Sequence, residues 1–161
     1  MVIRPAETSD TEKIAATHKA SIETICSNFY NSQSIAGWVE ILSPAIYEDA
    51  IENKVMILAE ENEEILGIGI LDLAEGEIGA IYIHPKAKGK GYGRKLLLEL
   101  ESIALKNNVT QLALCSTMNA LGFYQHHGYI GTDKTFHELP NGIKLECIKM
   151  SKNLKKQNES A

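Results

Sequence analysis

The chain of 161 residues has few of the features that mark membrane-spanning or repetitive proteins. No apolar run approaches the roughly 18 residues that a membrane-spanning helix needs, so we expect no membrane partner. The first five residues, Met1–Pro5, are typical of a strand and not of a signal peptide. There is no internal repeat. These absences favour an ordinary soluble protein, which we expect to be cytoplasmic.

Cysteine is scarce and shows no metal-binding spacing. Cys26, Cys115 and Cys147 are widely separated, and no two of them form a C-x-x-C pair. We therefore expect three reduced, buried thiols. The adjacent His126 and His127 would point about 100° apart on a helix, so they do not form a metal pair. The sequence predicts no metal cofactor.

The charge is distributed unevenly along the chain. The formal net charge is −5, yet the segment 84–95 carries +5, so the remainder carries about −10. A local basic segment on an acidic body suits a polyanionic ligand. Nucleic acid would require an extended basic face and aromatic platforms, and neither is evident. The hydrophobic content of 44% and charged content of 23% are those of one folded domain, which we place at 1–152, followed by a polar, disordered tail at 153–161.

The most informative segment is 81–97, where an apolar, β-branched run passes through a glycine-rich turn into an amphipathic helix. Glycines at 89, 91 and 93 leave the backbone N–H groups free to turn toward one anionic group. The helix start near Gly91 adds further unpaired N–H groups. The segment 84–95 has no acidic residue and five cations: Lys86, Lys88, Lys90, Arg94 and Lys95. This pattern predicts a site for a diphosphate or polyphosphate.

Two common phosphate-binding motifs do not match this turn. A kinase-type loop needs G-x-x-x-x-G-K-[ST], but Gly93 is followed by Arg94, Lys95 and Leu96. A dinucleotide fingerprint needs G-x-G-x-x-G, which the glycine spacing here does not give. The remaining alternative is a flexible surface turn whose lysines are simply solvated.

The turn closely resembles motif A of the GNAT (Gcn5-related) N-acetyltransferase superfamily, a strand followed by [QR]-x-x-G-x-[GA] and a helix. Here it reads Lys88-Gly89-Lys90-Gly91-Tyr92-Gly93, with lysine where glutamine or arginine is usual. The family uses this loop to bind the pyrophosphate of acetyl-coenzyme A. The resemblance therefore implies acetyl-CoA as co-substrate, bound by Lys88, Gly89, Lys90, Gly91, Gly93 and Arg94.

A second segment, 119–129, resembles the family's N-A-x-x-F-Y-x-x-x-G-[FY] block. It implies cofactor-binding roles for Asn119 and Tyr124. In the longer form of this block, the asparagine position would fall on Thr117.

The pattern of apolar residues predicts an α+β fold. We expect helices near 10–28, 33–41 and 44–53 and a long helix after Gly91. The resemblance implies a GNAT-like central, mostly antiparallel mixed sheet flanked by helices and splayed at the cofactor cleft between 77–83 and 111–115. The backbones of Ile81 and Ile83 would then pair with the pantetheine arm. The expected strands are Val2–Arg4, Val55–Glu60, Ile65–Leu73, Glu77–Ile83, Gln111–Cys115, Tyr129–His137 and Lys144–Lys152.

The expected chemistry is direct acetyl transfer from a thioester to an amine. The resemblance places the Tyr124 hydroxyl near the sulfur as a general acid, the alternative being that the ring only packs. For the general base we name Glu77, which by the period of two in a strand should share a face with Gly79 and Ile81. The alternative is a solvated residue at a strand end, and Asp72 and His84 are rival bases.

Two functions remain open. One is an N-acetyltransferase acting on an amine-bearing small molecule or protein, and the other is a coenzyme A-binding or sensor domain without efficient catalysis. In the family, the acceptor is recognised by the segment here at roughly 26–49 and by the last two strands. The aromatics of that segment could form an acceptor wall or anchor helices in the core: Phe29, Tyr30, Trp38 and Tyr47. The sequence is also compatible with a homodimer.

Overall fold

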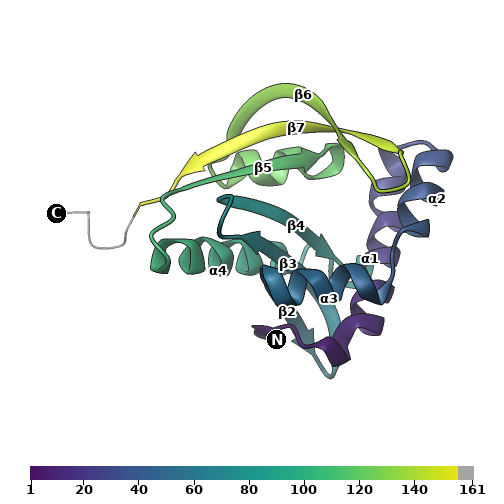
Figure 1. The fold of residues 1–161 in the computed structure, drawn as a ribbon, viewed down its shortest axis with the longest axis horizontal. Coiled ribbons are helices and arrows are strands. Elements are labelled where there is room, and N and C mark those ends of the chain that lie inside the picture. The colour runs from purple at the N-terminus through teal and green to yellow at the C-terminus, as the bar shows by residue number, and fades with distance from the viewer. Residues whose placement is uncertain (156–161) are drawn as a thin grey trace.

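A computed structural model describes residues 1–155, which form one sheet with helices on both faces (Figure 1). The sheet has seven strands in the order β1-β2-β3-β4-β5-β7-β6. Every neighbouring pair is antiparallel except β4 and β5, which are parallel. The expected α+β, mostly antiparallel mixed sheet is therefore confirmed. The strands are β1 Val2–Pro5, β2 Val55–Glu61, β3 Glu64–Asp72, β4 Glu77–Ile83, β5 Gln111–Thr117, β6 Ile130–Glu138 and β7 Lys144–Asn153.

The helices cover both faces of the sheet, and the alternating side chains of β2 show which helices lie on which face. Met56 and Leu58 pack with α1 and α3, whereas Ile57 and Ala59 pack with α4. No helix in residues 1–155 is long and apolar enough to cross a membrane. The α-helices are α1 Thr11–Thr24, α2 Ser32–Glu40, α3 Pro44–Asn53, α4 Tyr92–Lys106 and α5 Leu121–His126.

The first helix is shorter than expected. It ends at Thr24, and Cys26–Asn28 form a separate 3₁₀ turn instead of continuing to Asn28. The last strand is longer than expected. It runs through Asn153, and Leu154 packs against the core while its N–H donates to the carbonyl of Thr110. The predicted tail therefore begins too early, and its residues 156–161 lie outside the described part of the chain.

The sheet opens between β4 and β5, as Figure 1 shows. These strands pair only at Glu77 with Ala113 and at Ile78 with Leu114. By contrast, β5 stays paired with β7 along its whole length, from Gln111 to Thr117. Among residues 1–155, no strand pairs with the edge of β4 that faces β5 past Ile78, which gives the expected splay.

A bulge in β4 overturns our expectation for the face of Glu77. The register with β3 shifts between Ile70 and Leu71, which leaves Gly79 as an extra residue. The bulge breaks the period of two, so Ile78 packs in the same core cluster as Ile81. The assignment of Glu77 to the face of Ile81 is therefore wrong, because an extra residue lies between them.

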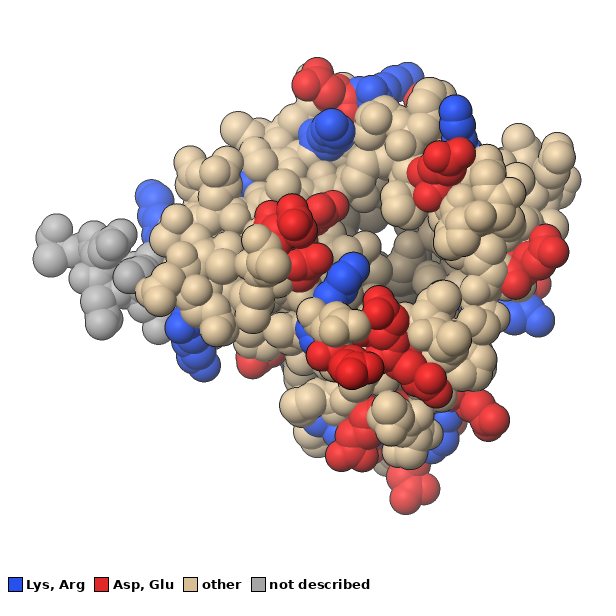
Figure 2. All heavy atoms as spheres, viewed as in Figure 1, with Lys and Arg blue, Asp and Glu red and all other residues tan. Residues whose placement is uncertain are grey.

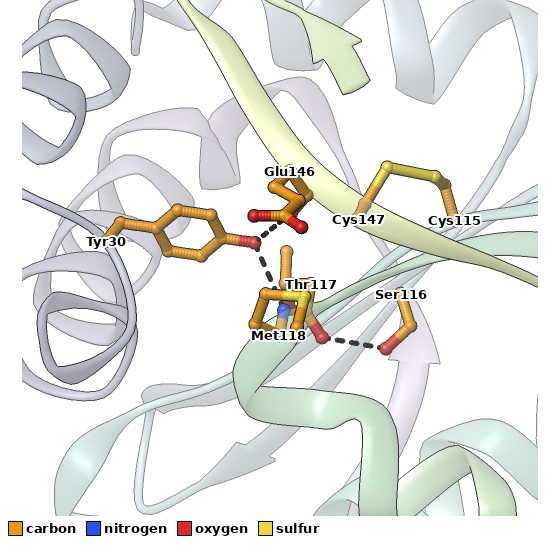
Figure 3. Close-up of a disulfide and its surroundings, with 7 residues drawn as sticks. All are labelled: Tyr30, Cys115, Ser116, Thr117, Met118, Glu146 and Cys147. Carbon is orange, nitrogen blue, oxygen red and sulfur yellow. Dashed lines mark hydrogen bonds between the residues drawn. A yellow bond between two sulfur atoms is a disulfide. The ribbon is translucent and has the colours of Figure 1, made fainter. Parts of the chain in front are cut away.

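The expectation of three reduced thiols is also wrong, because Cys115 and Cys147 form a disulfide (Figure 3). Cys115 lies on β5 and Cys147 on the neighbouring β7, with Cα atoms 5.7 Å apart. Their separation of 32 positions in the chain concealed this proximity. Cys26 remains a free, buried thiol.

The position of α4 depends on two glycines of β3. A Cβ atom on Gly67 would lie 2.8 Å from Cδ1 of Leu96, and one on Gly69 would lie 3.2 Å from Cδ1 of Leu100. A side chain at either position would have to displace these leucine side chains or the helix that carries them. These glycines therefore let α4 lie close to β3, which fixes the helix start near the end of β4.

We expect Gly67→Val to destabilise the fold by about 1–3 kcal/mol, because it overpacks the contact with Leu96. Urea unfolding followed by circular dichroism measures the change. Gly122→Ala is the control, since a Cβ atom at Gly122 would meet no atom within 4 Å. Equal midpoints for the two variants would contradict this account of how α4 is held.

Candidate active site

The glycine loop is anchored at both ends and exposed in the middle. The N–H of His84 donates to Leu66 on β3, at 2.8 Å, and Ala87 is buried against Leu66 and Tyr92. The Tyr92 hydroxyl donates to a carboxylate oxygen of Glu61 at 2.5 Å. Residues 88–91 between these anchors are all exposed. The loop is thus held firmly while its backbone stays accessible.

Gly89 and Gly91 have the left-handed backbone that glycine adopts without strain, with φ of 81° and 82°. A Cβ atom on either would meet nothing within 4 Å, so the space above them is open. Gly91 is also the N-cap of α4, whose first N–H groups have no partner within the helix. The loop and the helix start together form a concave anion site of backbone donors.

Glycine at position 93 serves helix packing and not the open space above the loop. A Cβ atom there would lie 3.3 Å from Cε1 of Phe123, so this glycine lets the first turn of α4 approach α5. That approach brings the second predicted motif beside the first.

These elements enclose a cavity of about 410 Å³. Of the predicted cofactor residues, all except Lys90 line it. The lining residues from those predictions are Ile81, Ile83, Lys88, Gly89, Gly91, Gly93, Arg94, Asn119 and Tyr124. Lys90 is exposed in the same loop but lies outside the lining. Two segments that are far apart in sequence thus meet at one cavity.

The backbone of β4 presents its free groups to the open side of the sheet. His84 donates its N–H to β3, and N–H and C=O groups alternate sides along a strand. Tyr82 therefore also turns its N–H toward β3, while Ile81 and Ile83 turn theirs toward the gap beside β5. This is the geometry that pairing with an extended ligand requires.

Asn119 lies in a short 3₁₀ turn, Met118–Ala120, which is held by a hydrogen bond to Tyr30, a residue far away in the sequence. The Tyr30 hydroxyl accepts the N–H of Met118 at 3.1 Å and donates to the carbonyl of Glu146 at 2.6 Å (Figure 3). Within residues 1–155, the side-chain oxygen of Asn119 is buried without a hydrogen-bond partner. Such a group is costly to leave unpaired, which favours a ligand donor beside it.

Tyr124 lies on α5 with 5% of its surface exposed. Its ring packs edge-on against Phe123 and Tyr129. Burial raises the pKa of Tyr124 well above its usual value, so the hydroxyl keeps its proton at neutral pH. Among the described residues this hydroxyl has no hydrogen-bond partner. It is therefore a free donor at the cavity.

Several lining residues escaped the sequence analysis because they carry no motif. Ser21 comes from α1, Ile25 directly follows that helix, and His127 follows α5. Burial lowers the pKa of His127, with a smaller contribution from the neighbouring His126. The ring of His127 lies tilted against that of Phe123, at 4.8 Å between centroids. Only the packing of α1 and α5 against the splayed strands places these residues here.

A second cavity, of about 540 Å³, adjoins the first, and Tyr82 and Thr117 line both. It lies among α1, α3, β3, β4, β5 and the β6–β7 hairpin. The space-filling view shows an opening through the molecule (Figure 2). Tyr82 and Thr117 therefore lie where the two cavities adjoin.

The structure places two of the three candidate bases in one cavity and the third elsewhere. Glu77 and Asp72 line the second cavity, whereas His84 lines neither cavity and accepts the N–H of Lys86 through Nδ1. Of the aromatics at 26–49, Trp38 lines the second cavity, Tyr47 is buried, and Phe29 is 55% exposed. No group of three metal-binding side chains occurs within residues 1–155.

Comparison with known proteins identifies the fold family. A family model described as an acetyltransferase (GNAT) domain matches residues 26–154. The chain belongs to this family. The resemblance inferred from the two motifs is thereby confirmed.

Solved structures share the fold of this GNAT domain. A GCN5-related N-acetyltransferase from Rhodopseudomonas palustris has a TM-score of 0.86 and 24% identity, with 95% of each chain covered. The PaiA N-acetyltransferase from Thermoplasma acidophilum, in complex with coenzyme A, has a TM-score of 0.77 and 21% identity over 94% of this chain and 98% of that one. YncA, a putative acetyltransferase from Salmonella typhimurium with acetyl-CoA, has a TM-score of 0.65 and 21% identity over 98% and 95%.

We expect Gly91→Val to weaken coenzyme A binding at least tenfold, because the new side chain would fill the open space above the loop. The matched control is Gly142→Val in the β6–β7 turn. Gly142 has a similar φ of 85° and equally open surroundings, so the backbone strain is the same. Calorimetric titration with coenzyme A measures both variants, and equal affinities would contradict the phosphate assignment.

We expect Lys88→Ala to cost about 1–2 kcal/mol of binding free energy, as the loss of a charge-assisted contact to a partly exposed anion does. The loss should shrink when the titration is repeated at high salt. Lys106→Ala, at the far end of α4, is the control. An equal loss in both variants would show a general charge effect and not a specific contact.

Proposed function

We propose that this chain is an acetyl-CoA-dependent N-acetyltransferase that moves an acetyl group directly to an amine of a small molecule or protein. The observation that carries the proposal is the meeting of the two cavities at Tyr82 and Thr117. One cavity has an anion-binding loop and a free strand edge, and the other has carboxylates and aromatic rings. An acyl donor and an amine can thus approach each other through the splayed sheet.

The residues present fit the coenzyme. The open backbone above Gly89 and Gly91, with Lys88 and Arg94 beside it, would hold the pyrophosphate. The free backbone groups of Ile81 and Ile83 would hold the pantetheine amides. The unpartnered oxygen of Asn119 would accept a further hydrogen bond. When bound, acetyl-CoA supplies an acetyl group activated as a thioester.

Tyr124 is the proposed general acid, which holds a proton at its hydroxyl for the departing thiolate. A buried tyrosine is a weaker acid than one in water, so proton transfer needs a strongly basic thiolate. Burial of the sulfur beside Tyr124 would raise the pKa of the thiol in the same direction, which would keep the transfer feasible.

Glu77 remains the proposed general base. Its place in the second cavity puts it on the side from which the amine would enter. Asp72 is its partner across the β3–β4 ladder and stays an alternative.

The second candidate function is a coenzyme A-binding or sensor domain. Two observations favour it: Gly79, at the bulge of β4, has no side chain that could act as a base, and Lys88 lacks the planar fork of arginine. Thiol release from acetyl-CoA across a panel of amines separates the two candidates. Tight coenzyme A binding without turnover of any amine would favour the sensor.

We expect Tyr124→Phe to lower kcat by about 10²–10⁴-fold, the usual contribution of a positioned acid, while coenzyme A binding survives. The loss should shrink with an acyl donor whose thiol is more acidic. Tyr129→Phe is the matched control, because that hydroxyl donates to Glu101 at 2.9 Å and does not line the cavity. Near-full kcat for Tyr124→Phe would show that the tyrosine only packs.

A further inference from the structure

The disulfide between Cys115 and Cys147 lies where β5 loses one of its two neighbouring strands (Figure 3). The pairing of β4 with β5 ends at Ile78 and Leu114, and Cys115 is the next residue of β5. Among residues 1–155, no strand pairs with that edge of β5 from Cys115 onward. On the other edge, β7 pairs with β5 as far as Thr117. The disulfide therefore strengthens the remaining attachment of β5 at the opening of the sheet.

The two cysteines also form part of the wall of the second cavity. Both line it, together with Thr117 and Leu145 from the same two strands. Thr117 lies two residues after Cys115, is the register partner of Cys147, and lines the first cavity as well. A change at the disulfide therefore acts directly on the place where the two cavities adjoin.

The cysteine pair is open to thiol chemistry, whereas the third cysteine is not. Cys115 is half-buried and lines the cavity, through which a small thiol can approach. Lys149 is the direct partner of Cys115 on β7, so the two side chains lie on the same face of the sheet. A neighbouring cation favours the thiolate, the form that exchanges with disulfides. Cys26 is fully buried, and burial raises the pKa of its thiol to about 12, so it stays protonated and unreactive.

The disulfide is not needed to bring β5 and β7 together. The two strands already pair from Gln111 to Thr117. Neither cysteine belongs to the core cluster that packs under α4, to which Leu112 and Leu114 of β5 contribute. Opening the bond therefore leaves the ladder and the core in place and frees only the end of β5.

The turn that follows β5 is held separately. The Tyr30 hydroxyl accepts the N–H of Met118 and donates to the carbonyl of Glu146, and neither bond involves a cysteine. Asn119 lies in that turn and lines the first cavity. The cofactor side of the site should therefore keep its shape when the disulfide opens.

Reduction would change the shape of the second cavity. Two bonded sulfur atoms lie about 2 Å apart, a distance that two separate thiols cannot keep. Cys147 is only 2% exposed and closely packed, so the sulfur of Cys115 is the one that can move, and the open space beside it is the cavity. The wall next to Thr117 then loses its fixed form.

We propose that Cys115 and Cys147 form a redox switch for the second cavity: the disulfide holds the end of β5 for acceptor binding, and reduction by a dithiol releases it and lowers acceptor turnover. One thiolate of the dithiol attacks a sulfur of the disulfide, and its second thiol then displaces the protein from the mixed disulfide. The dithiol gives up two electrons and leaves as a cyclic disulfide, and its two protons end on the cysteine sulfurs. The inference rests on the proposed acetyltransferase function and adds a control of the same site.

The test compares protein oxidised with glutathione disulfide and protein reduced with dithiothreitol, each freed of the reagent. Acetyl-CoA and the amine that turns over fastest in the panel are the substrates, and mass spectrometry measures the acetylated amine, so that no thiol reagent is present. On reduction we expect kcat/KM for the amine to fall about fivefold or more, as a local packing change can produce. The Kd of coenzyme A should change by less than about twofold, because that site is held independently. Reoxidation should restore kcat/KM.

Two variants separate the switch from a general effect of the reagents. The double variant Cys115→Ser with Cys147→Ala should show the low kcat/KM of the reduced protein under both conditions and respond to neither reagent. Cys26→Ala is the matched control, because it removes the cysteine that lies outside the pair, and it should keep the full response.

Each outcome bears on one claim. Equal kcat/KM in the two states, or no Cys115–Cys147 bond by mass spectrometry in the oxidised protein, would overturn the switch while leaving acetyl transfer in place. Loss of coenzyme A binding on reduction would show general unfolding and would overturn it too. If coenzyme A binds but no amine turns over in either state, the proposed function fails. Amide hydrogen exchange then decides the inference: reduction should speed exchange at 115–117 and not in β2, and equal exchange at 115–117 would overturn it.

Discussion

The opening in the sheet exists because β4 and β5 pair at only two positions in the described part of the chain. Backbone N–H and C=O groups are rarely left unpaired in a protein interior, and two neighbouring strands normally stay in register along their length. Here the parallel pair stops after Ile78, so the sheet consists of two halves, β1–β4 and β5–β7. The free edge of β4 past that point is a template for an extended ligand, which would complete the ladder in place of a strand.

Contacts outside the ladder hold the two halves at this separation. Helix α4 begins beside the end of β4 and packs under β3, and its first turn touches α5 at Gly93 and Phe123. On the other side, Tyr30 fastens the segment after β5 to β7. Packing and hydrogen bonds on both sides therefore hold β4 and β5 apart. The basic loop follows one end of β4, whereas Asp72 and Glu77 lie at the other end of the β3–β4 pair.

The part of the site predicted from sequence is the part encoded locally. Gly89 and Gly91 adopt the backbone that their spacing predicts, because a turn into a helix depends on few neighbouring residues. The side of the sheet that Glu77 faces depends on the bulge at Gly79, two residues further along β4. The period of two in a regular strand therefore predicted the wrong face. The disulfide and the placement of His18 depend on which strands and helices become neighbours, and no local pattern carries that information.

The free edge of β4 can be tested by amide hydrogen exchange, residue by residue. The N–H groups of Ile81 and Ile83 face the gap, whereas that of Tyr82 turns toward β3. The account predicts that saturating coenzyme A slows exchange at Ile81 and Ile83 severalfold and changes Tyr82 far less. Unchanged exchange at both isoleucines in the coenzyme A complex would contradict the claim that this strand edge binds the cofactor.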